Sequence, residues 1–418
     1  MKLLYDLSIH IFDALLPLFK GVNPKLRLFV EGRKNIFKTL ENSDLTQKKT
    51  IWVHAASLGE YEQAVPVLQE IRHRLSDHFI VLTFFSPSGY ENKKMSPLAD
   101  LITYLPLDTP KNAERFMQIV NPDLSFFIKY DIWPNYLQQL KKLKGKTYLV
   151  SGAFKKTQLY FKWYGGFMRK ALNAFDYIFL QNQASQQLLH SIDITETIVS
   201  GDTRFDRVAH QIEQDNTLSF IEDFVKDQLC IVCGSTWPED EKILIDFINS
   251  PIVQENRIKI VIAPHQINDK HINQLEEKLA VSSFRYSNLN GQTPQQVNVL
   301  IIDAIGFLTR AYSYADIAYV GGAMGDTGLH NILEPATFGI PIVIGQHFDD
   351  FPEAKKLRQL AGLYSVASAK ELQDIMIKLI MDEKFRRQTG MICGHYINSN
   401  TGATRIIMEH VMNQTETA

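Results

Sequence analysis

Short apolar runs alternate with helical patterns from residue 50 onward. The runs predict strands, and helical stretches such as 60–75 and 135–145 lie between some of them; the strand segments are 49–55, 79–85, 101–107, 124–128, 146–152 and 177–182. Strands that alternate with helices indicate βαβ units and a parallel sheet. We therefore expect one Rossmann-like domain in this part of the chain.

The same alternation begins again after about residue 206. Apolar runs lie at 229–235, 258–265, 297–303, 317–323 and 340–346, with helical patterns such as 240–249 and 271–280 between them. The fold class is therefore α/β with two Rossmann-like domains, at 26–205 and 206–418, and the last helices are candidates to pack back on the first domain. Two such domains facing across a cleft are expected to hold a ligand between them.

The first 25 residues form a separate pattern. Residues 3–19 are apolar but are interrupted by Asp6, His10 and Asp13, which fits neither a spanning helix nor a cleaved signal. Residues 1–50 contain nine Lys/Arg against five Asp/Glu. This pattern favours an amphipathic helix at an anionic membrane surface. The alternative is a helix packed on the first domain.

Composition and motifs exclude several classes of protein. The formal net charge of −2 over 418 residues gives no reason to expect nucleic-acid binding. Cys230 and Cys233 form a C-x-x-C within an apolar run, where positions i and i+3 of a strand face opposite ways, so we expect two buried thiols. The sequence contains neither a Walker A motif nor an H-E-x-x-H pair, which argues against a P-loop NTPase and a metal centre.

A glycine-rich turn at 319–345 is typical of a nucleotide site. An apolar strand is followed by Gly321, Gly322, Gly325 and Gly328, and then by a predicted helix whose start carries Asn331 and Glu334. Glycines allow the backbone to approach a ligand closely, and the free N–H groups of a helix start favour phosphate. Glu334, one turn into that helix, could accept hydrogen bonds from the two hydroxyls of a ribose.

The segment HAASLGE, residues 54–60, places a carboxylate at a predicted strand-to-helix turn. Ser57 and Glu60 fit the S-x-x-E capping box, in which two side chains satisfy the first N–H groups of a helix. The residues alone leave open whether Glu60 is a cap or a catalyst.

The order of motifs resembles a known family, the 3-deoxy-D-manno-octulosonic acid (Kdo) transferases, which are B-type glycosyltransferases with two Rossmann-like domains. The resemblance covers most of the chain and rests on HAASLGE (54–60), PLDTP (106–110), DIWPNYL (131–137), VSGAF (150–154), GDTRFD (201–206), GSTWPEDE (234–241), IAPHQ (262–266), DAIGFLTRAYSYADIAYVGG (303–322) and GLHNILEPATFGIPIVIGQH (328–347). The resemblance implies transfer of Kdo from a CMP-Kdo donor to a hydroxyl of a lipid A precursor, without a metal or other cofactor. It also implies work at the cytoplasmic face of the inner membrane, with the chain either peripheral or singly anchored through its N-terminus. Residues 26–205 would bind the acceptor and 206–418 the CMP-sugar.

The resemblance also assigns residues. Glu60 matches the family's general base, and the nucleotide-binding positions are Pro264, His265, Ile305, Gly306, Phe307, Asn331, Ile332, Leu333 and Glu334. Two departures are evident, since Phe307 replaces an acid and no arginine lies beside His265. The family's acidic pair before Ile-Trp-Pro is Lys129 and Asp131 here, so an acid role at this place rests on Asp131.

Two further residues are candidates for the phosphate or the cleft. Arg204 could supply the missing cation, and the alternative is an ion pair with Asp202 or Asp206. Ser235 could donate to phosphate, and the alternative is capping of the next helix.

The implied chemistry is a single inverting displacement, in which Glu60 takes the proton of the attacking hydroxyl. This requires Ser57 to remain the N-cap while the Glu60 carboxylate points into the cleft, away from the Ser57 N–H. The alternatives are a sugar-nucleotide epimerase, a B-type glycosyltransferase with another donor, and a non-catalytic lipid-binding protein.

Overall fold

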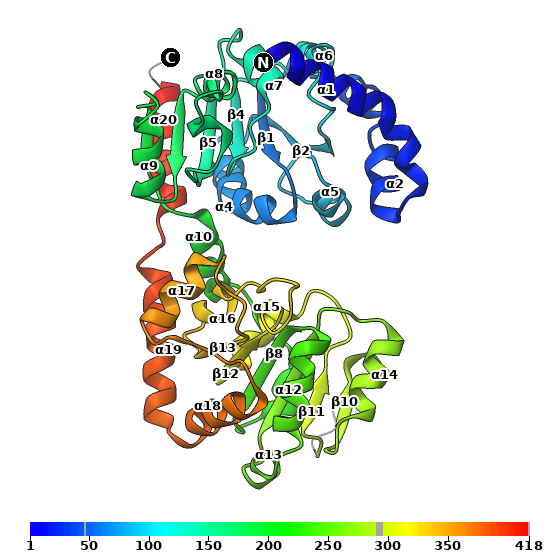
Figure 1. Cartoon of the computed structure of the whole chain (residues 1–418), viewed down its shortest axis with the longest axis vertical. Coiled ribbons are helices and arrows are strands. Elements are labelled where there is room, and N and C mark those ends of the chain that lie inside the picture. The colour runs from blue at the N-terminus through cyan, green and yellow to red at the C-terminus, as the bar shows by residue number, and fades with distance from the viewer. Residues whose placement is uncertain (46, 290–295, 417–418) are drawn as a thin grey trace. The chain divides into compact units, whose positions relative to one another are not determined.

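The computed structural model describes residues 1–45, 47–289 and 296–416. The chain divides into two compact units, unit 1 with residues 1–207 and 401–418, and unit 2 with residues 208–400. Each unit contains a seven-stranded, entirely parallel sheet flanked by helices (Figure 1). The predicted fold class, α/β with two Rossmann-like units, is confirmed.

The sheet of unit 1 has the strand order β3-β2-β1-β4-β5-β6-β7. Its strands are β1 (Thr50–Ala55), β2 (Phe79–Phe84), β3 (Leu101–Tyr104), β4 (Leu124–Ile128), β5 (Lys146–Gly152), β6 (Tyr177–Leu180) and β7 (Thr197–Val199). The central strands β1, β4 and β5 are almost wholly buried, because helices cover both faces of a parallel sheet. This burial explains the continuous apolar runs from which they were predicted.

The helices of unit 1 connect these strands. They are α4 (Leu58–Arg74), α5 (Pro87–Lys93), α6 (Pro110–Val120), α7 (Pro134–Leu140), η2 (Leu159–Phe161), α8 (Gly166–Leu172) and α9 (Gln183–His190). The helix α10 (Thr203–His210) follows β7, begins in unit 1 and ends in unit 2. The last helix, α20 (Ala403–Glu416), also belongs to unit 1. Its Ile407, Met408 and Val411 are buried in one core cluster with Val67 and Leu68 of α4.

The sheet of unit 2 has the order β10-β11-β9-β8-β12-β13-β14. Its strands are β8 (Cys230–Thr236), β9 (Lys259–Pro264), β10 (Ser283–Arg285), β11 (Val299–Ile301), β12 (Ile317–Val320), β13 (Ile342–Ile344) and β14 (Leu363–Ser365). Cys230 and Cys233 of β8 are buried and unpaired, as predicted.

The helices of unit 2 are for the most part short. They are η3 (Gln211–Glu213), α11 (Ser219–Val225), α12 (Pro238–Ile248), α13 (Pro251–Glu255), α14 (Asp269–Glu277), η4 (Tyr286–Asn288), α15 (Leu308–Ala311), η5 (Tyr312–Tyr314), α16 (Leu333–Thr337), α17 (Pro352–Gln359), α18 (Ala369–Met381) and α19 (Glu383–Asn398).

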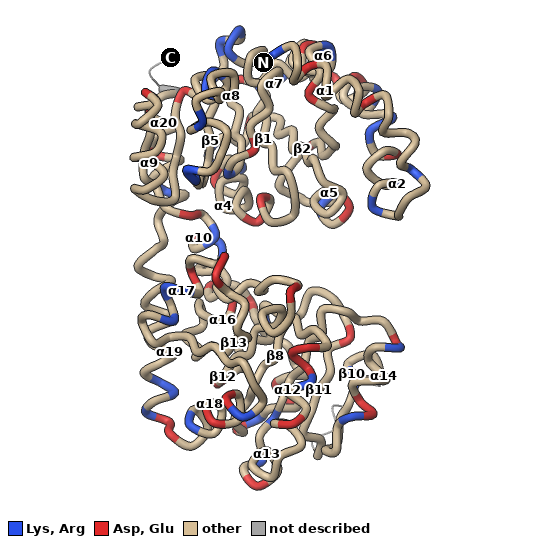
Figure 2. The backbone as a smooth tube through the Cα atoms, viewed as in Figure 1, with Lys and Arg blue, Asp and Glu red and all other residues tan. Residues whose placement is uncertain are grey.

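The N-terminal segment is a chain of short helices. The predicted helix over 3–19 divides into α1 (Lys2–Leu15) and the 3-10 helix η1 (Leu16–Gly21), and α2 (Pro24–Glu31) and α3 (Ile36–Glu41) follow. Figure 2 shows Lys and Arg recurring along α2. Several large apolar side chains of α1 and η1 are exposed, including Leu3, Leu4, Leu7 and Leu18. Within the described part of the chain, every helix is too short or too polar to cross a membrane.

Candidate active site

Each sheet has a topological switch point at its centre. In unit 1, β1 pairs with β2 on one side and with β4 on the other; in unit 2, β8 lies between β9 and β12. Ligands of open α/β sheets bind outside the carboxyl ends of the strands at such points. The motifs found in the sequence lie there. Residues 54–60 and 235–237 span the carboxyl ends of β1 and β8, and 129–133 and 321–331 follow β4 and β12.

Glu60 lies in the first turn of α4, with its side chain 15% exposed. The Ser57 hydroxyl donates a hydrogen bond to one carboxylate oxygen of Glu60. Nζ of Lys129 lies 3.9 Å from the other oxygen. The predicted side-chain cap is absent. Ser57 occupies the N-cap position, but its side chain makes no capping bond, because the hydroxyl is used as a donor to Glu60.

Lys129 follows β4 with a backbone φ of +69°, a left-handed conformation that is uncommon for a non-glycine residue. Its ammonium group lies 5.0 Å from the centroid of the Tyr130 ring and faces Glu60. The position at which the resemblance leads one to expect an acid therefore carries a cation opposite the candidate base.

A buried network lies beneath this pair. His54 is fully buried in β1, and its Nε2 contacts the carboxylate of Asp131 and lies 3.1 Å from Nε1 of Trp133. Its Nδ1 lies 2.7 Å from the Thr83 hydroxyl, which also accepts from Nε1 of Trp52. The network fastens the loop after β4 to the two neighbouring strands. Asp131 thus lies against His54.

Asp108 joins two of the sequence motifs. Its carboxylate is 1% exposed and accepts the backbone N–H groups of Asn135 and Tyr136 at the start of α7 and the hydroxyl of Tyr5 in α1, at 2.7–3.1 Å. Burial raises the pKa of Asp108 to about 7, although these hydrogen bonds oppose the rise. The motifs PLDTP and DIWPNYL therefore contact each other through Asp108, and the same carboxylate attaches α1 through Tyr5.

In unit 2, Glu334 is held from two sides. Asn331 Nδ2 donates to Oε1 at 3.1 Å, and the Thr309 hydroxyl of α15 donates to Oε2 at 3.0 Å. The predicted helix start was placed too early, because α16 begins at Leu333 and Glu334 is its second residue. Asn331 precedes the helix and accepts the Leu333 N–H, while Ile332 is the N-cap.

Three nitrogen heterocycles gather at the carboxyl ends of β8, β9 and β12. The ring of His265 stacks on Trp237, with centroids 4.4 Å apart, and lies 4.7 Å from that of His330. Nε1 of Trp237 donates to Nε2 of His330 at 3.0 Å, which leaves the proton of a neutral His330 on Nδ1. Burial, with a smaller effect of His265, lowers the pKa of His330 to about 4; burial also lowers the pKa of His265.

Asp240 holds the turn that surrounds this stack. Its carboxylate accepts the backbone N–H groups of Trp237 and Gly322 and the hydroxyl of Tyr319. A Cβ on Gly321 would lie 2.4 Å from the carbonyl oxygen of Ser235, so the close approach of the two loops requires glycine.

The capping alternative for Ser235 is wrong. Ser235 lies within β8 with a φ of +54°, and Trp237 is the N-cap of α12. Pro264, the other predicted residue at this end of the sheet, is buried as the last residue of β9.

The Ile305-Gly306-Phe307 turn leads into α15, the helix of Thr309. Gly306 has a φ of +97°, and the Ile305 side chain is 87% exposed. The Phe307 ring packs on Phe220 and Tyr286. The turn is therefore tied to the Glu334 cluster through α15.

Arg204 belongs to unit 1, where its Nε and Nη2 lie 2.9 and 2.8 Å from Oδ2 of Asp202. This is the ion pair that was considered as the alternative to phosphate binding. The other candidate partner, Asp206, accepts hydrogen bonds from Gly402 and Thr404 at the start of α20.

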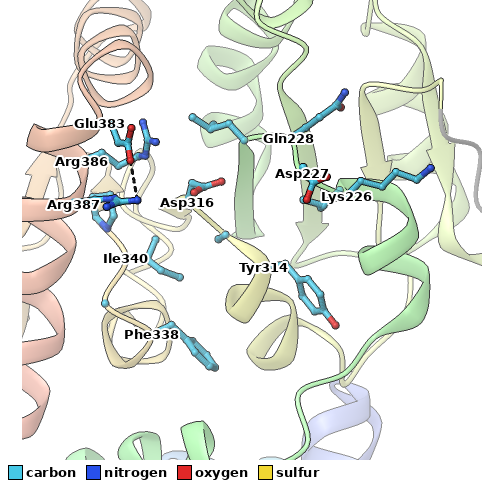
Figure 3. Close-up of a pocket in the computed structure, with 15 residues that line it drawn as sticks. Lys226, Asp227, Gln228, Tyr314, Asp316, Phe338, Ile340, Glu383, Arg386 and Arg387 are labelled. Atoms are coloured by element: carbon cyan, nitrogen blue, oxygen red, sulfur yellow. Dashed lines mark ion pairs between the residues drawn. The ribbon is translucent and has the colours of Figure 1, made fainter.

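A pocket of about 700 Å³ in unit 2 lies at the other end of the strands, away from their carboxyl ends (Figure 3). Leu229, Asp316 and Pro341, which line it, come just before β8, β12 and β13. Figure 3 shows Arg387 paired with Glu383 beside it. The amino ends of the strands lie here, so this pocket is separate from the residues predicted from the sequence.

Comparison with known proteins points to one family. Residues 31–207 match the model of the family described as 3-deoxy-D-manno-octulosonic-acid transferase (kdotransferase). A 3-deoxy-D-manno-octulosonic acid transferase of Aquifex aeolicus is 26% identical, with 81% of this chain and 88% of that protein covered. The chain is thus similar to Kdo transferases, over residues 31–207 by the family model and over most of its length by the curated relatives. The relative from Haemophilus influenzae is 24% identical, with 88% of each chain covered.

Other similar proteins limit what can be inferred about function from the family match. A bifunctional glycosyltransferase/methyltransferase of Fusobacterium nucleatum is 23% identical over 86% of this chain, which spans only 56% of that protein. A solved UDP-GlcNAc 2-epimerase of Neisseria meningitidis has a TM-score of 0.62 and 14% identity, covering 87% of this chain and all of that one. A glycosyltransferase of Rickettsia africae has a TM-score of 0.58 and 13% identity, over 89% and 100%. These structures show the fold alone, which transferases and epimerases share.

Proposed function

We propose that this chain transfers Kdo from CMP-Kdo to a hydroxyl of an acylated lipid A precursor, with inversion and without a metal. The observation that carries the proposal is the position of Glu60. It lies at the switch point of the unit that matches the Kdo transferase family, partly exposed and opposite Lys129. A carboxylate in this position can act as the base for an attacking alcohol.

In the proposed reaction, Glu60 takes the proton as the acceptor oxygen attacks the anomeric carbon of Kdo. The bond from that carbon to the CMP phosphate breaks in the same displacement, and its electron pair leaves with CMP. Lys129 balances the charge of Glu60 before the proton arrives. Ser57 orients the carboxylate by donating to it.

Unit 2 is proposed to bind the CMP moiety. Asn331 and Glu334 offer hydrogen-bonding groups for the ribose, and the adjacent turn of Ile305, Gly306 and Phe307 offers an apolar edge. The resemblance leads one to expect an arginine beside His265. In its place the proposed phosphate contacts are His265 and Nδ1 of His330, whose rings lie 4.7 Å apart. Ser235, Arg204 and Asp131 stay candidates for the remaining polar contacts.

The acceptor carries acyl chains, so unit 1 is proposed to work at an anionic membrane surface. The exposed leucines of α1 and η1 and the lysines and arginines that follow them support this, since apolar and basic groups together favour an interfacial position. We propose a peripheral location at the cytoplasmic face of the inner membrane. Removal of residues 1–20 tests it, because persistence of the truncated protein on anionic vesicles would contradict this role.

The test of the proposed reaction is release of CMP from CMP-Kdo with and without a tetra-acylated lipid A precursor, in the presence of EDTA. Transfer predicts release only with the acceptor, whereas an epimerase acts without it. We expect Glu60→Gln to retain CMP binding and to lower kcat by at least about a hundredfold, the usual contribution of a general base. Ordinary turnover in this variant would contradict the assignment of Glu60.

A further inference from the structure

Arg33 is a part-buried cation in unit 1. Its guanidinium lies 3.6 Å from the centroid of the Phe29 ring and 4.9 Å from those of Phe85 and Tyr104. It donates to the backbone oxygens of Phe29 and Phe85, at 3.1 and 2.6 Å, while its Nε is buried with no partner. Among the described residues, no carboxylate lies within ion-pair distance of Arg33.

Removing the Arg33 charge from water without a counterion is energetically unfavourable, and a purely structural role does not explain it. Burial lowers the pKa of Arg33 to about 9, so the side chain is still charged at neutral pH. A buried charge normally has a counterion, because desolvation without one is unfavourable. The absence of an acidic partner within the described chain indicates that the counterion comes from a ligand.

Arg33 lines a pocket of about 320 Å³. Leu16, Val30 and Leu107 form part of its apolar wall. Its charged groups are Asp13 and three cations, of which Lys20 is paired with Glu31 at 2.7 Å; the other two are Arg33 and Lys34. A mostly apolar pocket of this size with two available cations suits an anion attached to a hydrocarbon chain.

The pocket lies at the carboxyl ends of the strands of unit 1, as Glu60 does. Leu107 follows β3, and Phe85, whose carbonyl accepts from Arg33, follows β2. The Phe85 ring lies 4.7 Å from that of Trp133, which in turn contacts His54. A series of contacts along the carboxyl ends of neighbouring strands therefore connects Arg33 with the network beneath the candidate base.

We propose that this pocket binds the phosphate group of a phosphorylated, acylated lipid, with Arg33 as the principal cation and Lys34 as the second. Arg33 can donate to phosphate oxygens through its remaining Nη hydrogens. The wall formed by Leu16, Val30 and Leu107 contacts the first carbons that bear the phosphate. The inference rests on the proposed function only in that the acceptor is lipid-borne.

Calorimetric binding of dihexanoyl phosphatidic acid to the full chain tests the pocket directly. Inorganic phosphate and dihexanoyl phosphatidylcholine serve as comparison ligands. We expect the phosphatidic acid to bind and each comparison ligand to bind at least about tenfold more weakly, since inorganic phosphate lacks the acyl chains and the choline group of phosphatidylcholine neutralises its phosphate. Inorganic phosphate binding as tightly as the lipid would overturn the apolar part of the proposal.

Arg33→Met replaces the cation by an apolar side chain of similar length. We expect Tm to be unchanged or higher, because replacing an unpaired buried charge by a hydrophobic residue is often stabilising, and lipid affinity to fall at least about tenfold. Lys34→Gln, at an exposed position of the pocket, should lower affinity about threefold without affecting folding. Lys25→Gln is the matched control, because it removes one charge from α2 outside the pocket.

Unchanged lipid affinity in Arg33→Met would contradict the proposal. So would equal losses in Lys34→Gln and Lys25→Gln, which would indicate attraction by net charge alone. If Arg33→Met fails to fold, the comparison of Lys34→Gln with Lys25→Gln still decides.

Transfer assays identify the source of the lipid. A raised KM for detergent-dispersed acceptor in the Arg33 variant, with an unchanged KM for CMP-Kdo, would indicate the phosphate of the acceptor. Reduced binding to phosphatidic acid vesicles with an unchanged acceptor KM would indicate a membrane phospholipid. Phosphatidic acid binding in a chain that transfers no Kdo would leave the pocket valid and refute the proposed function alone.

Discussion

The hydrogen bond from Tyr5 to Asp108 offers a quantitative test of how α1 is attached. Tyr5→Phe removes only the hydroxyl and keeps the ring contact with Phe167, whose centroid is 5.5 Å away. Asp108 then keeps its two backbone donors, from Asn135 and Tyr136. The variant thus removes one of three hydrogen bonds to a carboxylate that is 1% exposed.

The pKa of Asp108 makes the effect depend on pH. Its folded value of about 7 lies roughly 3 units above the ordinary value, which corresponds to roughly 4 kcal/mol against ionisation in the folded state. Between about pH 4 and 7 the folded protein binds the proton that the unfolded chain has lost. The unfolding free energy therefore falls as the pH rises through this window.

Loss of the Tyr5 hydroxyl should cost more when Asp108 is ionised. A hydrogen bond to a charged group contributes about 1.5–3 kcal/mol, and a neutral one about 0.5–1.5 kcal/mol. We expect the variant to be about 1 kcal/mol more destabilising at about pH 8.5 than at about pH 5.5. Burial is the largest cause of the raised pKa and is unchanged in the variant.

Amide hydrogen exchange, read as protection factors for peptides of residues 2–15 and 134–140, gives the local free energy of opening. Tyr164→Phe, at an exposed tyrosine, is the control for loss of a hydroxyl. An equal effect of Tyr5→Phe at both pH values would refute the argument from Asp108. So would protection lost only in 134–140, since the hydroxyl belongs to α1.

Two further variants test the site itself. Lys129→Met should lower kcat for Kdo transfer about tenfold with CMP affinity unchanged, because it removes the cation 3.9 Å from Glu60. Lys156→Met, at an exposed lysine, is the control. Equal kcat values in the two variants would contradict the role of Lys129 beside Glu60. His330→Phe keeps a ring in the stack but removes the Nδ1 donor, so Kd for CMP, measured by calorimetry, should rise about tenfold. Since the pKa of His330 is about 4 in the folded state, its contribution to stability is present above about pH 6.5 and is lost as the pH falls toward 4. Tm should therefore decrease less on acidification in the variant than in the unsubstituted protein.

The central strands were predictable because each is buried on both faces. β4 and β5 appear in the sequence as continuous apolar runs at the residues where the structure has them. The strands β7, β10 and β14 were missed, since each has three residues and lies at a sheet edge. Part-buried side chains at an edge leave no continuous apolar run from which to predict a strand.

Parts of the candidate site were predictable where a residue and its immediate sequence neighbours already indicate a role. The glycine requirement at Gly321 and the carboxylate of Glu60 are visible in single short segments. The partners of these residues were not. His54 is a polar residue in a fully buried strand, a signal that could have marked it, but its contact with Asp131 depends on which strand lies beside β1.

The strand order decides which motifs come together in the site. β1 pairs with β2 through the next crossover, but it also pairs with β4, the strand that begins 69 positions after β1 ends, at Leu124 against Ala55. No local pattern specifies that second pairing, because every buried parallel strand presents a similar apolar run. Once it is known, Glu60 and Lys129 must be neighbours, and in unit 2 the same arrangement of β8 and β12 brings Trp237 to His330. The two sheets therefore place their chemistry at equivalent points, the carboxylate and lysine in one and the heterocycles in the other.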